Sequence, residues 1–557
     1  MAAEFNQDPP RLTNQYEDDP LLASYLRWRL PREMFDEIEP DLRRIGRLAA
    51  TEWLALDAAA EADPPRLVAY DPWGRRIDRI DTSPAWRELD RIAAIEGLVA
   101  IGYDRAHGAL SRIDQFTRLY LYAPSSSTYS CPLAMTDGAA RLLELYPDEV
   151  TRPVLGHLRS RDPDEFWTSG QWMTERTGGS DVSMTSTTAV RDGDGYRLSG
   201  TKWFTSATTS QIAITLAYTK EGESRATSLS AFLVRLRDAD GALRGIRVNR
   251  LKDKLGTRAL PTAELTLDGA PAHVIGGPGD GVRKIASMFN VTRVYNAVAA
   301  VAGMRRALAL ARDYAARRVA FGKPLLEQPL HTATLAAMEL EWRGAFLLAF
   351  HTVELLGKQE CGDATPDDLA RLRLLIPIAK LYTAKQAVAV ASEALECFGG
   401  AGYIEDTGLP RLLRDAQVLP IWEGTTNVLS LDVLRALEKT NALAAYATFA
   451  RARLAAVTGS GSLHAAAVRL RDAVDSIESF ADRLGRERRD FGEAHARAFA
   501  YAIARTTIGL LLLEYAIWTL SADGDRDAVL AATQWCERPL TAWDNEEGPV
   551  PSPMIIG

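Results

Sequence analysis

The spacing of hydrophobic residues changes along the chain. Up to about residue 165, apolar positions recur at helical intervals between proline-marked turns. From about 166 to 275 they alternate with other residues, which is typical of strands, as at Ile212, Ile214 and Leu216. Helical spacing returns from about residue 281. The pattern therefore predicts an α+β protein in which a sheet domain lies between helical ones.

These changes place four predicted domains along the sequence. They are an N-terminal helical domain (1–165), a central antiparallel β domain (166–280), a helical bundle (281–437) and a C-terminal helical extension (438–557). In the last segment Leu470, Val474 and Ile477 follow four-three spacing, which predicts an amphipathic helix. No internal repeat or low-complexity tract stands out.

Composition restricts the class of protein. The chain has 557 residues, of which 47% are hydrophobic and 25% charged, as expected for a soluble globular protein with several domains. Its net charge of -8 argues against nucleic-acid binding by the whole surface. The four cysteines form no CxxC pair, which indicates free thiols in a reducing compartment. The histidines show no metal-ligand spacing, so no metal site is expected.

The sequence contains neither a signal peptide nor a clear membrane span. The N-terminus lacks a basic start followed by an apolar core. The longest apolar run, Ile508 to Leu520, contains Glu514 and is too short to cross a bilayer, so we expect a buried core helix. A cytoplasmic protein without membrane contact is predicted.

One polar segment near residue 423 is a candidate catalytic loop. The run from Leu419 to Asn427 places Glu423 between Trp422 and Gly424. A carboxylate beside a large aromatic is suited to proton abstraction, and the glycine lets another group approach the backbone. Thr425 and Asn427 offer hydroxyl and amide groups to a polar ligand. Taken alone, a Trp-Glu-Gly segment is more often an ordinary loop than a catalytic one.

The segment is similar to the catalytic-base loop of the acyl-CoA dehydrogenase family, in which a Glu before Gly-Thr removes the proton alpha to a thioester. Three further blocks resemble the same family in the same order. They are Met173–Asp181, Gly200–Ser206 and Arg318–Leu325. The resemblance covers nearly the whole chain and implies an acyl-CoA dehydrogenase-like fold, an FAD cofactor and a homotetramer.

The first two blocks imply contacts to the flavin. The glycine-rich first block implies cofactor contacts from Met173, Thr174, Gly179 and Ser180, with Thr174 on the flavin and Ser180 on the pyrophosphate side. In the second, Phe204 is expected to stack on the isoalloxazine, and Ser206, with Thr205 beside it, to face N5. Phe204 stands where the family usually has Trp, so an indole N–H is lost.

The third block implies contacts to the other half of FAD. Arg318 and Phe321 match the family's Arg-x-x-Phe-Gly element, which reaches the pyrophosphate in a neighbouring subunit. Gly399 and Gly400 match a Gln-x-x-Gly-Gly element, with Glu396 in place of Gln. Trp422, Thr425 and Asn427 complete the expected cofactor contacts.

The resemblance also assigns the base and a substrate contact. One branch of the family carries its base at the position of Thr292, and a threonine cannot serve, so the role falls on Glu423. Arg293 matches a family arginine near the base and is expected to contact substrate. The implied reaction removes the alpha proton of an acyl thioester while the beta carbon loses a hydride to flavin N5. Electrons then pass to a flavoprotein or to oxygen. Neither the acyl chain nor the carrier, CoA or a carrier protein, follows from the sequence.

Two peptides and the length favour the AidB-like branch of alkylation-response flavoproteins. The peptides are Phe5–Pro10 and Pro64–Leu67. That branch carries a C-terminal domain with a basic face assigned to DNA. Residues 438–557 hold 13 lysines and arginines against 16 aspartates and glutamates, a net -3, and acids interleave with the arginines from Arg483 to Arg489. This pattern indicates an ion-paired surface and disfavours DNA binding.

Two alternatives remain open at this point. The first is an AidB-like, DNA-associated stress-response flavoprotein with weak dehydrogenase activity. The second is an enzyme on the same fold that uses flavin and oxygen. Nitroalkane oxidases of the second kind use Asp as the base, so Glu423 disfavours that reading.

Overall fold

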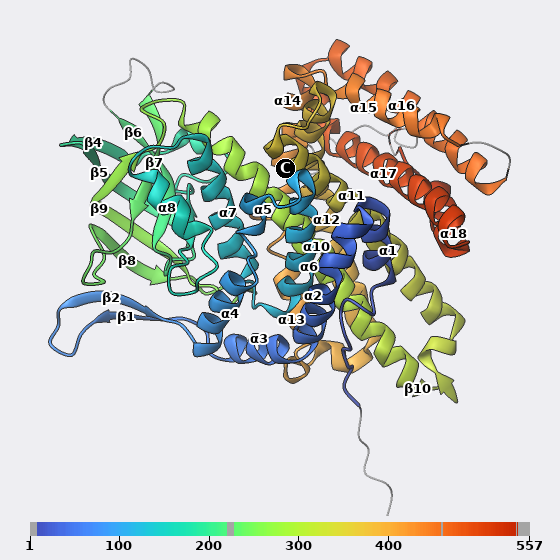
Figure 1. The fold of residues 1–557 in the computed structure, drawn as a ribbon, viewed down its shortest axis with the longest axis horizontal. Coiled ribbons are helices and arrows are strands. Elements are labelled where there is room, and N and C mark those ends of the chain that lie inside the picture. Colours follow the sequence, from blue (N-terminus) through green and yellow to red (C-terminus); the bar gives the residue numbers. More distant parts are fainter. Residues whose placement is uncertain (1–7, 220–227, 458–460, 542, 544–557) are drawn as a thin grey trace, which may run out of the picture. The chain divides into compact units, whose positions relative to one another are not determined.

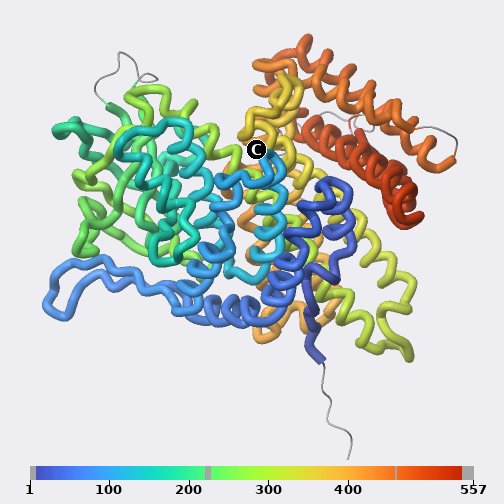
Figure 2. Tube along the Cα trace, in the orientation of Figure 1, coloured from blue at the N-terminus to red at the C-terminus, as the bar shows by residue number. Residues whose placement is uncertain are grey.

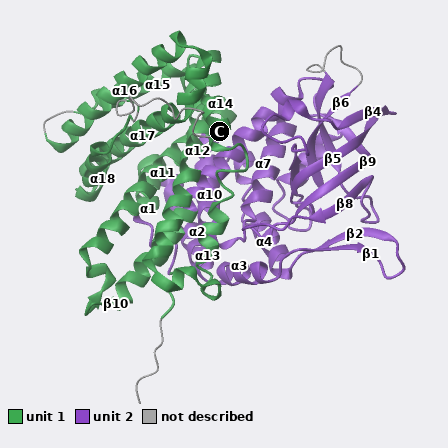
Figure 3. Ribbon diagram, turned by 180° about the vertical axis from the view of Figure 1, so that it is seen from behind, with its two compact units in different colours: residues 1–12, 21–31, 303–557 green, residues 13–20, 32–302 purple. Residues whose placement is uncertain are grey.

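The computed structural model describes residues 8–219, 228–457, 461–541 and 543. The chain forms two compact units. We call residues 13–20 and 32–302 the sheet unit, and residues 1–12, 21–31 and 303–557 the helical unit (Figure 3). Residues Phe5 to Gln7 of the branch-specific N-terminal peptide lie outside the described residues.

Helices precede the strands in the sheet unit (Figure 1). They are α2 (Arg32–Ala50), α3 (Glu52–Ala62), α4 (Pro84–Ile95), α5 (Ile101–Asp104), α6 (Ser111–Tyr122), α7 (Ser130–Leu145) and α8 (Thr151–Leu158). The start of α4 shows why they begin where they do: Ser83 Oγ accepts a hydrogen bond from Trp86 N at 3.0 Å, and Pro84 occupies the first turn. The long helix α10 (Gly281–Arg317) follows the strands and contributes residues to both units.

Seven strands form one sheet. They are β3 (Ser169–Trp172), β4 (Thr188–Asp192), β5 (Gly195–Ser206), β6 (Ile212–Thr219), β7 (Leu229–Arg235), β8 (Ile246–Leu251) and β9 (Thr262–Val274). Most neighbours are antiparallel, but β6 runs parallel to β3 and β4. Strand β6 pairs with both β4 and β7, so the strands β4, β5, β9, β7 and β6 form a closed ring of pairings. Apolar side chains such as Trp172, Phe232 and Leu265 fill the core.

A hairpin within the N-terminal helical region was not predicted. Strands β1 (Arg66–Tyr70) and β2 (Arg76–Asp81) pair in antiparallel fashion, and Figure 1 draws them as a long ribbon beside β8. The buried carboxylate of Asp78 accepts from Val248 N at 3.0 Å, and Arg76 Nη2 donates to Val248 O at 2.8 Å. These contacts fix the hairpin to the sheet. Each strand is short and charged residues lie in the turn between them, so the alternation of apolar and polar residues is too weak to predict a hairpin.

The helical unit consists almost entirely of helices. They are α1 (Pro20–Arg29), α11 (Pro329–Cys361), α12 (Pro366–Cys397), α13 (Pro410–Ala416), α14 (Thr426–Lys439), α15 (Ala442–Ala455), α16 (Ser462–Arg486), α17 (Arg489–Ala522) and α18 (Arg526–Glu537). A two-strand hairpin of β10 (Val319–Ala320) and β11 (Lys323–Pro324) follows α10. The central helix α12 starts with a capping box between Thr365 and Asp368 and packs against α11, α14 and α15.

The C-terminal extension packs helix on helix. Figure 2 shows the chain of α16, α17 and α18 running side by side, and all three contact one another. The predicted amphipathic helix is α16, with Leu470, Val474 and Ile477 buried. Most of the apolar run from Ile508 is buried inside α17, as predicted, although Leu520 at its end is 44% exposed and the helix is longer than the run.

Two helices of the described chain, α12 and α17, are long and apolar enough to cross a membrane. In each, 78% of the most apolar window is buried inside the protein, which is the state of a core helix. The absence of membrane contact stays a prediction. So do the four domain boundaries, whereas the helix–sheet–helix order of the chain is confirmed.

Candidate active site

The first predicted flavin loop is organised by a buried carboxylate, Glu175. Its two oxygens accept hydrogen bonds from the backbone N–H and hydroxyl groups of Ser186 and Thr187, at 2.5–3.2 Å. Lys202 Nζ lies 2.8 Å from Glu175 Oε1 and 3.1 Å from Leu216 O. Both members of this ion pair are almost fully buried. The carboxylate therefore ties the loop that follows β3 to strands β5 and β6.

The electrostatics of this pair favour the ionised acid. Burial alone would raise the pKa of Glu175, but the Lys202 ammonium and the hydroxyl donors lower that pKa to about 2. A buried, hydrogen-bonded ion pair is costly to break on one side only. The loop is thus held rigidly where the sequence predicts flavin contacts.

The second predicted block lies at the end of β5. Regular pairing with β9 is interrupted between Lys202 and Thr205, so the side chains no longer alternate strictly. Phe204 is left 55% exposed on the surface of the sheet unit. Thr205 turns inward and its hydroxyl donates to Ala263 O at 2.7 Å. Ser206 remains half-buried, with its hydroxyl 3.1 Å from the hydroxyl of Thr262.

The structure brings these two blocks together. Trp203 N donates to Thr174 O at 3.0 Å, which joins the loop to the bulged strand. Gly179 packs on the Thr174 side chain, since a Cβ there would lie 2.4 Å from Thr174 Oγ1. Met173 is buried, whereas Ser180 is exposed. The exposed ring of Phe204, the backbone of Thr205 and the half-buried hydroxyl of Ser206 are the parts of the strand that a flavin could meet.

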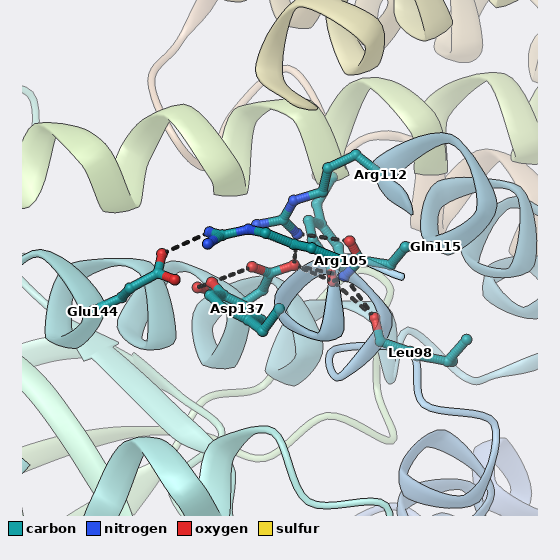
Figure 4. Close-up of polar contacts among 8 residues, drawn as sticks. Leu98, Arg105, Arg112, Gln115, Asp137 and Glu144 are labelled. Atoms are coloured by element: carbon teal, nitrogen blue, oxygen red, sulfur yellow. Dashed lines mark hydrogen bonds and ion pairs between the residues drawn. The ribbon is translucent and has the colours of Figure 1, made fainter. Parts of the chain in front are cut away.

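A buried polar cluster fixes α7 against α10 within the sheet unit (Figure 4). Asp137 Oδ2 accepts from Arg112 at 2.6 Å, from Gln115 at 2.7 Å and from Tyr295 at 2.9 Å. Its other oxygen accepts from Tyr103 at 2.7 Å. All five residues are buried, so the cluster holds the first half of α10 in one position.

The predicted substrate arginine lies on that half of α10. A Cβ at Gly138 would come within 2.8 Å of Met288 Cγ and 3.3 Å of Thr292 Cγ2, which shows how closely α7 packs there. Thr292 is buried and its hydroxyl donates to Phe289 O at 3.2 Å. Arg293 extends over the Phe289 ring at 5.9 Å. Arg293 belongs to the sheet unit and Glu423 to the helical unit.

Glu423 lies in a turn immediately before α14. Its backbone is left-handed, with φ of 56°, and Gly424 follows with φ of 106°. A non-glycine residue in this conformation costs roughly 1–3 kcal/mol, so surrounding contacts must hold it. Lys380 Nζ on α12 donates to Trp422 O at 2.7 Å and to Gly424 O at 2.6 Å. Thr425 is the N-cap of α14 but makes no side-chain cap hydrogen bond, so its hydroxyl is available to a ligand.

The predicted dinucleotide residues form a second group in the helical unit. Arg318 starts the β10–β11 hairpin, whose tip is Phe321 and Gly322, both with positive φ. Phe321 is 97% exposed. The Tyr314 ring, one turn before Arg318, packs on Phe398 at 5.2 Å, next to the exposed Gly399 and Gly400. Arg318 and the two glycines therefore share one end of the unit.

Sequence reasoning missed the residues that hold these loops. Glu175 and Lys202 stand inside the quoted blocks but were not assigned, and Lys380 lies in an apolar helical stretch. A charged residue within an otherwise apolar helix is a usable signal, because it needs a buried partner. Its partner, a backbone carbonyl 42 residues away, leaves no trace in the sequence.

Profiles of known families cover almost the whole chain. The acyl-CoA dehydrogenase middle domain matches residues 170–270, and the acyl-CoA dehydrogenase C-terminal domain matches residues 279–438. The N-terminal domain of the adaptive response protein AidB matches residues 6–165. The acyl-CoA dehydrogenase 11 C-terminal domain-like family matches residues 441–550.

Acyl-CoA dehydrogenase family member 11 of Caenorhabditis elegans is 44% identical over 96% of this chain and 89% of its own length. The chain belongs to the acyl-CoA dehydrogenase family. The Escherichia coli protein described as putative acyl-CoA dehydrogenase AidB is 36% identical over 72% of this chain and 74% of its own. The crystal structure of the C. elegans ACDH-11 in complex with C11-CoA superposes with a TM-score of 0.94, at 43% identity, covering 97% of this chain and 94% of that one. The predicted fold, the AidB-like relationship and the class of enzyme, an FAD-dependent oxidoreductase, are thereby confirmed.

The side chains of this acyl-CoA dehydrogenase suit an isoalloxazine and a diphosphate. Phe204 offers an exposed aromatic face, and the Trp422 indole Nε1, itself buried, has no hydrogen-bond partner within the described protein. Thr425 adds an unused hydroxyl and Arg318 a guanidinium. In the sheet unit the aromatic face suits a planar ring, and in the helical unit the donors suit an acceptor-rich ring edge and a dianionic tail, so the residues present in each unit fit a part of FAD.

Proposed function

We propose that this enzyme desaturates an acyl-CoA thioester, with Glu423 as the base that removes the alpha proton. The strained turn around Glu423 carries the proposal. A left-handed glutamate, flanked by two carbonyls that a buried lysine holds, is a costly arrangement for an ordinary loop and is typical of a functional site. A fixed carboxylate is what abstraction from a weak carbon acid requires.

The remaining site residues bind and orient. Bound FAD supplies the hydride acceptor of the reaction. Phe204 stacks on the flavin ring, while Thr174 and Ser206 contribute hydroxyl groups to its polar edge. Arg293, whose helix α10 is fixed by the Asp137 cluster, contacts the substrate.

The dinucleotide half of FAD falls to the helical unit. Arg318 neutralises the pyrophosphate, and the Gly399–Gly400 turn provides open backbone, since a Cβ at either glycine would touch nothing within 4 Å. The exposed Phe321 supports a homotetramer in which this hairpin enters a neighbouring subunit. Replacement of Phe321 by Ser should then weaken both the tetramer and flavin retention, measured by light scattering and by flavin absorbance.

The acyl group is proposed from the related structure. The nematode relative was solved with C11-CoA, so a chain of about that length is the first candidate substrate. The acceptor for the electrons is a flavoprotein or oxygen. Rapid reoxidation of the reduced protein by air would favour the flavin-oxygen alternative, and slow reoxidation would favour a flavoprotein. A cytoplasmic location remains a prediction.

Anaerobic titration with acyl thioesters tests the proposal. We expect C11-CoA to bleach the flavin absorbance, with shorter and longer acyl-CoA esters and acyl carrier proteins as the comparison panel. Bleaching by none of the thioesters, from a protein that retains its flavin, would overturn the proposed reaction.

A further inference from the structure

The turn that carries Glu423 needs support from outside itself. Two consecutive residues, Glu423 and Gly424, have positive φ, and neither belongs to a helix or strand. The turn lies between Ala416, the last residue of α13, and Thr426, the first of α14. Backbone hydrogen bonds from Ile421 N and Trp422 N to Val418 O, at 2.9 and 3.0 Å, hold only its first part.

Lys380 supports the second part. It lies in the middle of α12 and is completely buried. Its ammonium group donates to the carbonyl of Trp422, the residue before Glu423, and to the carbonyl of Gly424, the residue after it, at 2.7 and 2.6 Å. Both are short, charge-assisted bonds. The peptide groups Trp422–Glu423 and Gly424–Thr425 are thereby fixed to the same nitrogen, which restricts the backbone of the two residues between them and so the direction of the Cα–Cβ bond of Glu423.

We propose that Lys380 is a positioning residue for Glu423, so that its ammonium group sets the direction of the carboxylate for alpha-proton abstraction. The inference rests on the proposed function of Glu423. A displacement of about 1 Å at a reacting group can cost about a hundredfold in rate. Lysine suits this role because its compact ammonium group directs three donors around one atom, whereas the planar guanidinium of arginine would need more room.

The sheet unit provides a matched control. Lys284, near the start of α10, is also buried, and its Nζ donates to the carbonyls of Ile275, Gly276 and Gly277, at 3.1, 2.9 and 2.6 Å. It clasps a glycine turn by the same chemistry, but none of the proposed active-site residues lies in that turn. Lys284→Met thus measures what the loss of a buried lysine clasp does in general.

The test separates proton abstraction from folding and flavin binding. A non-oxidisable 3-thiaacyl-CoA deuterated at the alpha carbon would be incubated with holoenzyme, and loss of the label followed by mass spectrometry. We expect Lys380→Met to lower this exchange and kcat together by about 100-fold. Its KM and flavin content should stay within about threefold of wild type, and Lys380→Arg should recover part of the exchange. Lys284→Met should exchange at close to the wild-type rate.

The possible negative results of this experiment can be told apart. Absence of exchange in the wild-type enzyme would overturn the role of Glu423 itself. Wild-type exchange with an unchanged rate in Lys380→Met would overturn the positioning role alone. The positioning role would also be contradicted if Lys380→Met lost exchange only in proportion to lost flavin and Lys284→Met did the same. That result would show that Lys380 only stabilises the fold. If Lys380→Met does not fold, Lys380→Gln, which keeps one amide donor, is held to the same criteria.

Discussion

Two loops of this enzyme are held by buried lysines in different ways. In the sheet unit, Lys202 reaches the loop through the carboxylate of Glu175, which in turn collects donors from Ser186 and Thr187. In the helical unit, Lys380 binds the backbone carbonyls on either side of Glu423 directly. The first arrangement concentrates charge in the core, whereas the second uses two backbone carbonyls as its acceptors.

The difference predicts different consequences of losing each lysine. Without Lys202, Glu175 stays buried with a charge that nothing balances, so stability suffers most. Without Lys380, two carbonyls lose a donor, and the conformation of one catalytic side chain suffers most. The experiments below test this contrast, from the largest expected effect to the smallest.

Replacement of Glu423 by Gln should have the largest effect. The amide keeps the shape of the side chain but cannot accept the proton, and a general base contributes up to about 10⁴-fold in rate. We expect kcat to fall by about that factor while the flavin spectrum is retained. Turnover within tenfold of wild type would assign the base to another residue.

Replacement of Lys202 by Met should destabilise the sheet unit by about 3–5 kcal/mol, since it removes one partner of a buried ion pair. Urea denaturation would measure the loss. The double variant Lys202→Met/Glu175→Gln removes both charges and should recover much of that stability. If the double variant is as unstable as the single one, the cost comes from packing and the electrostatic account fails.

Acid should weaken the same pair. The folded-state pKa of Glu175 is lowered to about 2, so its contribution to stability is complete above the unfolded value of about 4.5. That contribution is lost as pH falls from about 4.5 towards 2. Between pH 6 and pH 3.5, wild type should lose more unfolding free energy than the double variant. Parallel losses in the two proteins would argue against the lowered pKa.

Replacement of Phe204 should have a smaller, local effect on flavin binding. Replacement by Leu keeps an apolar contact but removes the aromatic face, and aromatic stacking contributes about 0.5–1.5 kcal/mol beyond buried area. We expect flavin affinity to fall by up to about tenfold with unchanged stability of the apoprotein. Fluorescence titration of apoprotein with FAD measures the affinity, and urea denaturation of the apoprotein measures its stability. An unchanged affinity would remove Phe204 from the flavin site.

We expect neither the wild type nor any of the variants above to bind DNA. The predicted ion pairing of the C-terminal arginines is confirmed. Arg483, Arg486 and Arg489 each have an acid four residues away at 2.7–4.0 Å, and Arg488 lies 3.5 Å from Asp490. We expect no gel shift with duplex DNA at physiological ionic strength. A variant with Glu487, Asp490 and Glu493 neutralised should gain one. A salt-dependent shift by wild type would favour the DNA-associated alternative.

Whether a feature could be predicted from the sequence depends on how far apart along the chain the interacting residues lie. The strands around Ile214, the helix at Leu470 and the ion pairs around Arg486 were predictable because their signals are local. The hairpin at Tyr70 was missed because its stability depends on contacts to Val248, far along the chain. The clasp by Lys380 was missed for the same reason. The individual contacts of Thr174, Ser206 and Arg318 with the cofactor stay predictions.

Anaerobic flavin reduction with C11-CoA deuterated at the alpha carbon tests the central claim most directly. If Glu423 removes that proton as the flavin is reduced, stopped-flow spectroscopy should show bleaching that the label slows severalfold in wild type. Bleaching at the same rate with and without the label would contradict a chemical step that begins with loss of this proton.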